Sequence, residues 1–147
     1  MLHRARSRRG AAPDRRRQPL SVSQKDIAPT GTAIELRLNA EDPDNGFRPA
    51  PGELSRFDLP GGPGVRVDTG FTAGDRISPF YDSMIAKLIC WGADRDEALN
   101  RAQQALTELR IAGIPSTVGL HSRNLANADL RAGAAHTRWL KRLLGPS

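Results

Sequence analysis

The feature that most constrains the fold is the apolar run of residues 83–91, SMIAKLICW, which ends at Gly92. A run of this length and composition favours a central strand that is buried on both faces of a sheet. A helix is predicted directly after it, because Asp94 can cap the helix start and Glu97 stands at the reciprocal position of a capping box. The helix is predicted to end before Gly113, and its apolar face carries Leu99, Ala102, Leu106 and Leu109.

Three further stretches of the chain have the pattern of strands. Residues 32–40 alternate apolar and polar side chains, which is the period of a strand with one buried face. The prolines and glycine of residues 42–51 then force the chain to turn. Residues 54–59 and 65–71 form two short strands separated by PGGPG, and we expect them to pair antiparallel, because the glycines permit a tight reversal.

Two more helices are predicted near the C-terminus. Thr117 can cap a helix that carries Leu120 and Leu125, and a third helix starts near His136. The apolar residues of the third helix are Trp139, Leu140, Leu143 and Leu144. Because strands come first and helices follow, the expected class is α+β, an antiparallel sheet with packed helices. The 147 residues suit one folded domain, which we assign to residues 18–147.

Composition excludes several classes of protein. No apolar run approaches the roughly 20 residues that cross a membrane, and the Arg-rich N-terminus lacks the apolar segment of a secretory signal. We therefore expect a cytoplasmic protein without a membrane partner. The single cysteine, Cys90, lies in the apolar run and is expected to be a buried, inert thiol. The histidines lack metal-ligand spacing, so no metal site is expected at His3, His121 and His136.

The net charge of +6 comes from one end of the chain. Residues 1–20 hold seven arginines and one acidic residue, Asp14. Basic and acidic residues balance in the remainder, so the charge of the folded part does not indicate a nucleic-acid partner. Residues 1–17 are therefore considered as a separate arginine-rich tail of low complexity.

Five motifs follow one another in a fixed order along the chain. They are AIELRLNAEDP at residues 33–43, FRPAPG at 47–52, GPGVR at 62–66, YDSMIAKLICWG at 81–92 and DRDEA at 94–98. In kind, order and spacing they resemble the C-terminal domain of biotin carboxylase, the ATP-dependent ligase that carboxylates biotin. The resemblance implies an α+β fold of the biotin carboxylase C-terminal domain type.

The resemblance singles out Arg66, the arginine of GPGVR. In the family this arginine lies near bicarbonate and biotin, where it would stabilise the enolate-like oxygen that develops on the biotin ureido group. The residue type suits the task, because a guanidinium presents a rigid fork of donors to an oxyanion. The alternative is a surface ion pair between Arg66 and Asp68 or Asp75.

Other positions carry weaker implications. Trp91 and Arg95 match family positions at the homodimer interface, although Trp91 could instead close the core. Thr137 matches a position that touches the adenine of ATP, where the family usually has an apolar side chain. We do not assign a catalytic role to Tyr81, Asp82 and Lys87, because the strand period puts Ser83, Ile85 and Lys87 on one face and Asp82, Met84 and Ala86 on the other.

The sequence lacks the parts of the enzyme that handle ATP. It has no glycine-rich phosphate loop followed by Lys and no cluster of acidic metal ligands. In the family these belong to domains that precede the matched region, so we predict that this chain does not carboxylate biotin alone. The resemblance implies that the intact enzyme uses biotin, ATP and Mg. We expect none of the three to bind tightly to this chain alone.

Partners also follow from the resemblance. Biotin would arrive on a separate carrier protein, since no Lys flanked by Met occurs near the C-terminus. The chain would pair with itself or with a full-length biotin carboxylase subunit of an acetyl-CoA, propionyl-CoA or related acyl-CoA carboxylase of fatty acid metabolism. The choice of acyl-CoA belongs to a separate component. An alternative function is a noncatalytic interaction or regulatory module that pairs with a full-length subunit.

The arginine tail has two interpretations. Read one base later, codons for HRARSRRGAAPDRRR can encode TGLDLVAEQLRIAAG, and one added base joins this to the QPLS that starts at Gln18. The product has the helical apolar spacing that the family shows there, so residues 1–17 are interpreted as an out-of-frame translation of GC-rich DNA. The alternative is a natural basic arm, disordered in isolation, that binds nucleic acid or an acidic surface.

Overall fold

The computed structural model describes residues 23–145. In chain order its elements are η1 Gln24–Asp26, β1 Thr32–Asn39, β2 Glu41–Asp42, η2 Pro43–Asn45, β3 Arg48–Pro49, β4 Gly52–Glu53, β5 Arg56–Asp58, β6 Val65–Thr69, β7 Arg76–Ile77, β8 Met84–Gly92, α2 Arg95–Glu108, β9 Arg110–Ala112, α3 Val118–Ala126, α4 Ala128–Arg131 and α5 Trp139–Leu144. The predicted α+β class is confirmed. The tail of residues 1–17 lies outside the described residues, so its two interpretations stay predictions.

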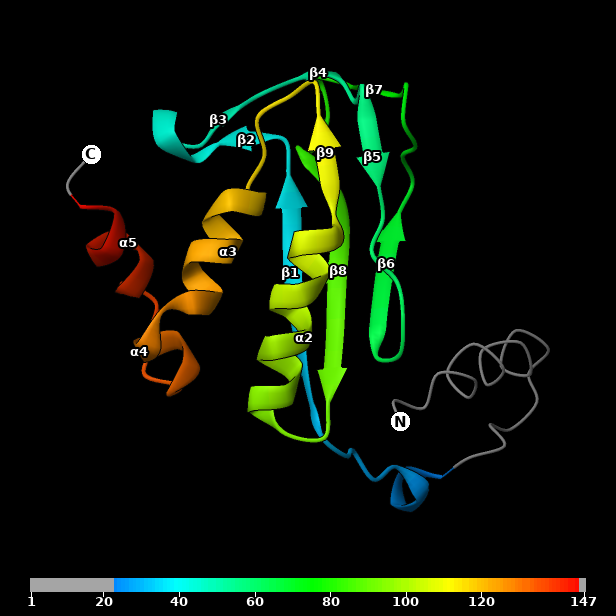
Figure 1. The fold of residues 1–147 in the computed structure, drawn as a ribbon, viewed down its shortest axis with the longest axis vertical. Coiled ribbons are helices and arrows are strands. Elements are labelled where there is room, and N and C mark those ends of the chain that lie inside the picture. The colour runs from blue at the N-terminus through cyan, green and yellow to red at the C-terminus, as the bar shows by residue number, and fades with distance from the viewer. Residues whose placement is uncertain (1–22, 146–147) are drawn as a thin grey trace.

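The long apolar run forms the centre of the main sheet, as predicted. β8 lies between β1 and β6 in an antiparallel sheet of order β1-β8-β6 (Figure 1). Leu36 stands opposite Leu88, and Val67 stands opposite Leu88 from the other side. Both neighbours satisfy the backbone of β8, which allows its apolar side chains to be buried without unpaired polar groups.

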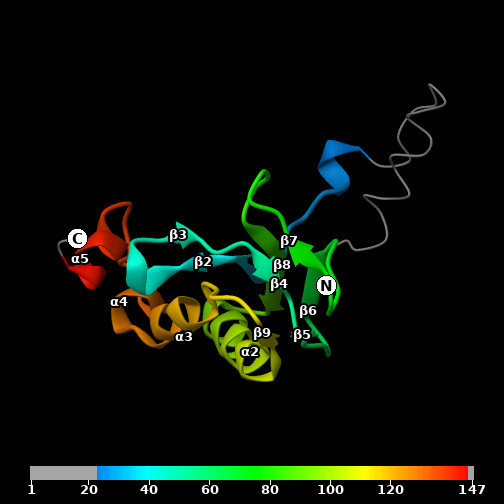
Figure 2. The same ribbon diagram turned by 90° about the horizontal axis from the view of Figure 1, so that it is seen from above.

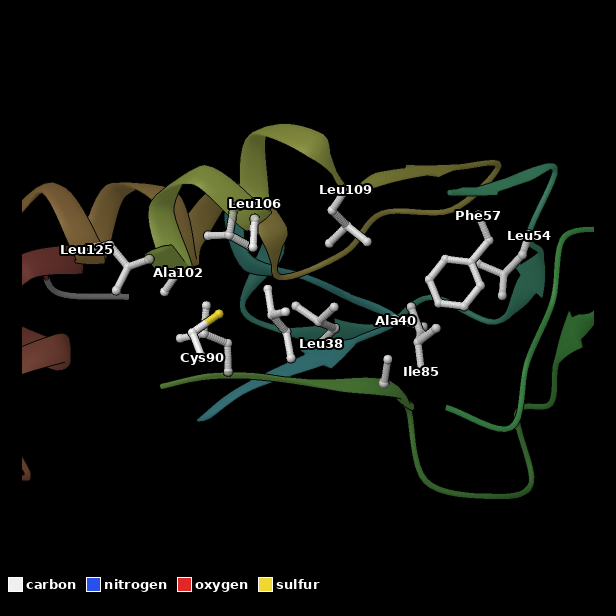
Figure 3. Close-up of a cluster of buried hydrophobic side chains, with 14 of the residues drawn as sticks. Leu38, Ala40, Leu54, Phe57, Ile85, Cys90, Ala102, Leu106, Leu109 and Leu125 are labelled. Atoms are coloured by element: carbon white, nitrogen blue, oxygen red, sulfur yellow. The ribbon is translucent and has the colours of Figure 1, made fainter. Parts of the chain in front are cut away.

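Within residues 23–145, the α-helices cover only one face of this sheet. Figure 2 shows α2 and α3 on the same side, and α2 packs against β8. The buried core between them comprises Leu36, Leu38, Ala40, Leu54, Phe57, Ile77, Ile85, Ala86, Leu88, Cys90, Leu99, Ala102, Ala105, Leu106, Leu109 and Leu125 (Figure 3). The prediction that β8 is buried on both faces is wrong, because Lys87, Ile89 and Trp91 are only partly buried.

A bulge modifies the alternation of β8. The pairing register shifts between Leu38 and Asn39, whose partners are Ala86 and Met84, so Ile85 is an extra residue. As a result Ile85 and Ala86 are both 2% exposed. The predicted placement of Ile85 on the face of Lys87 is therefore wrong. The predicted separation of Asp82 from Lys87 is confirmed, since Asp82 accepts from the Met84 N–H at 2.7 Å while Lys87 lies 3.9 Å from Glu35.

The predicted hairpin of residues 54–59 and 65–71 does not form. β5 pairs with β9, and β6 pairs with the edge of β8. The Trp91 N–H donates to the Gly64 carbonyl at 2.8 Å, so the chain that leaves the PGGPG turn joins the central strand. The turn at PGGPG was predicted correctly, but the two strands that flank it do not pair with each other. β5 pairs with β9, the segment after α2, and β6 pairs with the central strand β8.

The helix after β8 begins as predicted, with one difference. The Asp94 carboxylate accepts from the Glu97 N–H at 2.8 Å. The Glu97 carboxylate accepts from the Ala93 N–H at 2.5 Å and pairs with Arg101 at 2.6 Å. The reciprocal contact of the cap is thus made one residue earlier than a capping box requires. The four predicted apolar positions of α2 and its C-cap are all buried.

Thr117 has a different role from the one predicted. It stands at the N-cap of α3, but its side chain makes no cap hydrogen bond. Its buried hydroxyl accepts from the Asn39 N–H at 3.0 Å and donates to the Arg37 carbonyl at 3.2 Å. Thr117 therefore joins α3 to the outer edge of β1. The predicted third helix is confirmed as α5, which starts at Trp139, and its Leu143 and Leu144 are exposed.

Burial determines the state of two titratable groups. Burial raises the pKa of the Cys90 thiol to about 11, against the opposing charge of Arg101, so Cys90 remains a thiol at neutral pH. Burial lowers the pKa of His121, although its hydrogen bond to the Arg37 carbonyl opposes the shift.

Every helix within residues 23–145 is too short or too polar to span a lipid bilayer.

We predict that Thr117→Val destabilises the domain by about 1–3 kcal/mol, because the isosteric change leaves the Asn39 N–H without its acceptor in a buried position. Urea unfolding followed by circular dichroism measures the difference. Thr107→Val is the matched control, since the Thr107 hydroxyl bonds an exposed carbonyl on α2, and it should change the free energy of unfolding by less than about 0.5 kcal/mol. Equal effects of the two changes would contradict the assigned role.

We also predict that the free energy of unfolding falls as the pH drops below about 6.5, the ordinary pKa of histidine. The folded state holds His121 neutral, with a lowered pKa, whereas the unfolded chain takes up the proton. The stability is therefore present above that pH and is lost below it. His121→Gln should flatten the dependence between pH 7 and pH 5, and His136→Gln should retain it. If the free energy of unfolding of wild type and of His121→Gln depended on pH in the same way, His121 would not be the origin of the effect.

Candidate functional site

The uncovered face of the sheet gathers charged side chains from three strands. Because side chains alternate along a strand, the residues next to the buried Leu36 and Leu88 and the partly buried Val67 point away from α2. We define the open face by these residues, which are Glu35 and Arg37 of β1, Arg66 and Asp68 of β6, and Lys87, Ile89 and Trp91 of β8. The registers place Arg66 opposite Ile89, and Asp68 opposite Lys87.

Arg66 and Asp68 form a two-point ion pair on this face. The Arg66 Nε donates to Asp68 Oδ1 at 3.0 Å, and Nη2 donates to Oδ2 at 2.5 Å. Hydrogen bonding to the Asp68 carboxylate raises the pKa of Arg66, so the guanidinium stays charged. The side chain of Arg66 is 48% exposed and therefore accessible to a ligand. Of the two carboxylates considered from the sequence, the partner is Asp68.

The turn before Arg66 fixes the strand that carries it. Gly62 and Gly64 both have positive φ, at 113° and 74°. At Gly64 the backbone also passes so close to its neighbours that an added Cβ would lie 2.8 Å from the Trp91 carbonyl oxygen. The glycines predicted to allow close approach do so at Gly64, and they direct β6 along β8 with Arg66 on the open face.

Further charged groups lie on the open face with Arg66, and the sequence analysis did not assign them to the site. Lys87 Nζ lies 3.9 Å from Glu35 Oε1, and Arg37 Nη2 lies 3.6 Å from Met84 Sδ. The alternation of residues 32–40 already placed Glu35 and Arg37 on one polar face of a strand. What the pattern could not show is that β6 brings Arg66 to the same face.

The other residues predicted from the resemblance are Trp91, Arg95 and Thr137. Trp91 and Arg95 donate hydrogen bonds to backbone carbonyls. The Trp91 indole N–H donates to the Thr30 carbonyl at 2.9 Å, and Trp91 is half-buried. The Arg95 Nη2 donates to the Leu130 carbonyl at 2.6 Å, which ties α2 to α4. Thr137 lies exposed before α5. Their roles in dimerisation and adenine contact stay predictions.

A cavity of about 210 Å³ lies behind the PGGPG turn. Its walls come from the turn and from α2, and they comprise Gly61, Gly62, Pro63, Val65, Arg101, Gln104, Ala105 and Glu108. Arg66 is not among these residues, so the site around Arg66 is a surface and not this cavity. Among residues 23–145 no three His, Cys, Asp or Glu side chains gather to hold a metal ion.

The fold and the site define an α+β domain with helices on one face of its sheet and charged groups on the other. The family model of the biotin carboxylase C-terminal domain matches residues 35–142. The chain belongs to this family, as its motifs predicted.

Relatives and solved structures agree with the assignment. The chain is 46% identical over 124 residues to biotin carboxylase of Nostoc sp., covering 84% of this chain and 28% of that protein. It is 45% identical over 122 residues to biotin carboxylase 1 of Bacillus subtilis, covering 83% of this chain and 27% of that protein. The biotin carboxylase domain of thermophilic 2-oxoglutarate carboxylase bound to bicarbonate superposes with a TM-score of 0.83 at 38% identity, over 88% of this chain and 30% of that one.

A second structure bears on assembly. The biotin carboxylase domain dimer of Hydrogenobacter thermophilus 2-oxoglutarate carboxylase, in complex with MgADP, ADP and bicarbonate, has a TM-score of 0.84 at 38% identity, covering 88% of this chain and 29% of that one. The chain thus spans between a quarter and a third of the length of each of these four proteins.

We predict that Gly64→Ala destabilises the domain more than Gly62→Ala. Both changes impose a side chain on a positive φ, at about 1–2 kcal/mol each. Only the change at Gly64 also meets the Trp91 carbonyl and Arg101, which adds roughly 1–3 kcal/mol, because the Cβ at Gly62 would meet nothing within 4 Å. Chemical denaturation of the two variants provides the comparison. A larger loss at Gly62 would show that φ alone sets the cost.

Proposed function

We propose that this chain is the C-terminal part of an ATP-dependent biotin carboxylase and that Arg66 acts on biotin within the intact enzyme. The observation that carries the proposal is the charged, accessible Arg66 on the open face of the sheet. The biotin carboxylase domain of 2-oxoglutarate carboxylase that superposes on the chain binds bicarbonate, an anion that suits a guanidinium.

The proposed role of Arg66 is to stabilise negative charge. When the ureido nitrogen of biotin attacks the carboxyl donor, charge develops on the ureido oxygen, and a fixed cation beside that oxygen lowers the barrier. Asp68 engages Nε and one N–H of Nη2, so the donors left for the substrate are Nη1 and the second N–H of Nη2, on the other edge of the guanidinium. Asp68 is then a positioning residue, because it fixes the plane in which Arg66 donates.

The rest of the reaction requires residues that we assign to other parts of the intact enzyme. Phosphoryl transfer to bicarbonate needs a phosphate cradle and metal ligands. We propose that ATP and magnesium bind mainly to the part of the enzyme that precedes this domain, with Thr137 as an adenine contact. Biotin is expected on a separate carrier protein, and carboxylation by this chain alone is not expected.

We further propose that the chain associates with a second biotin carboxylase chain. Support comes from the dimer formed by the Hydrogenobacter domain. Trp91 and Arg95 are the proposed contact residues. The Arg95 side chain would contact the second chain through its aliphatic stem, since its guanidinium Nε and Nη2 donate to the carbonyls of α4.

The role of Arg66 is tested in a chimera in which residues 23–147 replace the matched segment of the Nostoc relative. Arg66→Ala should lower kcat for biotin-dependent ATP cleavage by about 100-fold or more, because an oxyanion donor is lost. Arg56→Ala is the matched control. Arg56 pairs with Asp58 two residues on, at 2.6 Å, as Arg66 does with Asp68, but it lies on β5. It should leave kcat within about twofold of wild type.

Two results would contradict the proposal. Equal losses from Arg66→Ala and Arg56→Ala would reduce Arg66 to a surface ion pair. Biotin- and bicarbonate-dependent ATP hydrolysis by the purified chain itself would disprove its predicted inactivity. Asp68→Asn should lower kcat by less than Arg66→Ala, and Asp68→Glu should restore part of the loss, because the proposed effect of Asp68 is exerted through Arg66.

A further inference from the structure

The guanidinium of Arg101 lies where three segments of the fold meet. Its Nη1 donates to the Trp91 carbonyl near the end of β8, and its Nη2 donates to Glu97 Oε1 of α2 at 2.6 Å. The third segment is the PGGPG turn, because an added Cβ at Gly64 would collide with the same guanidinium. The Arg101 side chain is 23% exposed and forms part of the wall of the cavity behind this turn.

The contacts of Arg101 require the shape of a guanidinium. Glu97 uses one carboxylate oxygen for Arg101 and the other for the Ala93 N–H, which it accepts at 2.5 Å. The planar fork of Arg101 can therefore reach a carbonyl with one arm and a carboxylate with the other, whereas a lysine ammonium has no such fixed geometry. Arg101 and Glu97 together hold the end of β8 against the start of α2.

The backbone carries this arrangement to the strand that bears Arg66. The Trp91 N–H donates to the Gly64 carbonyl at 2.8 Å, so the residue whose carbonyl binds Arg101 also binds the start of β6. Arg66 follows Gly64 by two residues and stands opposite Ile89 of β8. Arg101 lies on α2, which covers one face of β8, and Arg66 lies on the open face, so a contact on one side of the sheet sets a side chain on the other.

β6 depends on such contacts because it is an edge strand. In the sheet order β1-β8-β6, the strand pairs with β8 from one side. Its far end is tied by the Thr69 hydroxyl, which donates to the Ile85 carbonyl at 2.8 Å. Its near end, which carries Arg66, is tied by the junction of Arg101, Trp91 and the PGGPG turn.

We infer that Arg101 is a positioning residue for the reaction at Arg66. It acts through the Trp91 and Gly64 backbone and makes no contact with biotin. By fixing the start of β6, it aligns the Arg66 guanidinium with the ureido oxygen on which charge develops. The inference rests on the proposed function of Arg66 and deepens it. A displacement of about 1 Å far from the reacting atoms can lower a rate by roughly 100-fold, so the position of the strand matters.

Kinetics of the chimera that carries residues 23–147 test this role. Arg101→Ala should lower kcat for biotin-dependent ATP cleavage by about 10- to 100-fold and change the KM for ATP by less than about twofold, because the displaced group acts on biotin. Arg101→Lys keeps a donor for the Trp91 carbonyl but loses the fork, so its kcat should lie between those of wild type and Arg101→Ala. An unchanged kcat in Arg101→Ala, beside the expected loss in Arg66→Ala, would overturn this inference and leave the proposed function intact.

Arg131→Ala serves as the comparison for a loss of stability alone. Arg131 is also partly buried, and its guanidinium reaches the Leu125 carbonyl at 3.4 Å and the Asp96 carboxylate of α2 at 3.7 Å. It lies on α4, on the opposite side of the domain from β6 (Figure 1). The variant should keep kcat within about twofold of wild type. A loss of kcat as large as that of Arg101→Ala would show that neither arginine acts by positioning Arg66.

A double variant shows whether the effect of Arg101 passes through Arg66. If Arg101 only places Arg66, Arg101→Ala should lower kcat by less than about twofold when Arg66 is already replaced by Ala. A further loss of tenfold or more in the double variant would contradict the inference. If Arg66→Ala itself leaves kcat unchanged, the proposed function and this inference both fail.

Amide hydrogen exchange of the full chain provides a readout that does not depend on activity. The Trp91 N–H should exchange at least about tenfold faster in Arg101→Ala than in wild type, because its bond to the Gly64 carbonyl opens more often. The Thr117 N–H, which donates to the Asn39 carbonyl at 3.1 Å on β1, should keep its rate. An unchanged rate at Trp91 would show that Arg101 does not hold the start of β6, and the inference would be wrong.

Discussion

The packing of α2 against one face of β8 is the contact on which the rest of the structure depends. Burial of the apolar side chains between them supplies the core, because roughly 25 cal/mol is gained for each Å² of apolar surface removed from water. Backbone pairing of β8 with β1 and β6 then fixes two strands beside it. In the part of the chain that the structure describes, α-helices cover only one face, and the other face carries charged side chains.

This one-sided arrangement explains where the candidate site lies. Arg66 reaches the open face because Gly64 brings β6 against the Trp91 backbone and because the strand alternation then turns the side chain away from α2. Asp68, two residues further on, falls on the same face and orients the guanidinium. The same geometry occurs at Arg56 and Asp58, so the ion pair alone does not make a site. The proposed function depends on the charged side chains of the open face and on the rest of the intact enzyme.

Predictions from the sequence succeeded where one residue type answers a local requirement. Asp94 caps α2, the apolar positions of α2 are buried, and Cys90 is an inert buried thiol. They failed where a distant segment decided the outcome. The hairpin of residues 54–59 and 65–71 gave way to pairing with β9 and β8, and the Thr117 hydroxyl bonded to β1 in preference to its own helix. Ile85 left the expected face because a bulge opposite Leu38 and Asn39 adds a residue to β8.

The sequence by itself determined the family, the α+β class, the central strand and the choice of Arg66 as a candidate site residue. Motifs, periodicity and caps involve only a few neighbouring residues, so they can be identified without the structure. Only the tertiary structure decided which strands pair, that β8 is covered on one face, and that Glu35, Arg37 and Lys87 join Arg66 on the other. The physical reason is that pairing and burial join segments tens of residues apart. A strand pairs where burial of apolar surface lowers the free energy most, even when a local turn would favour another partner.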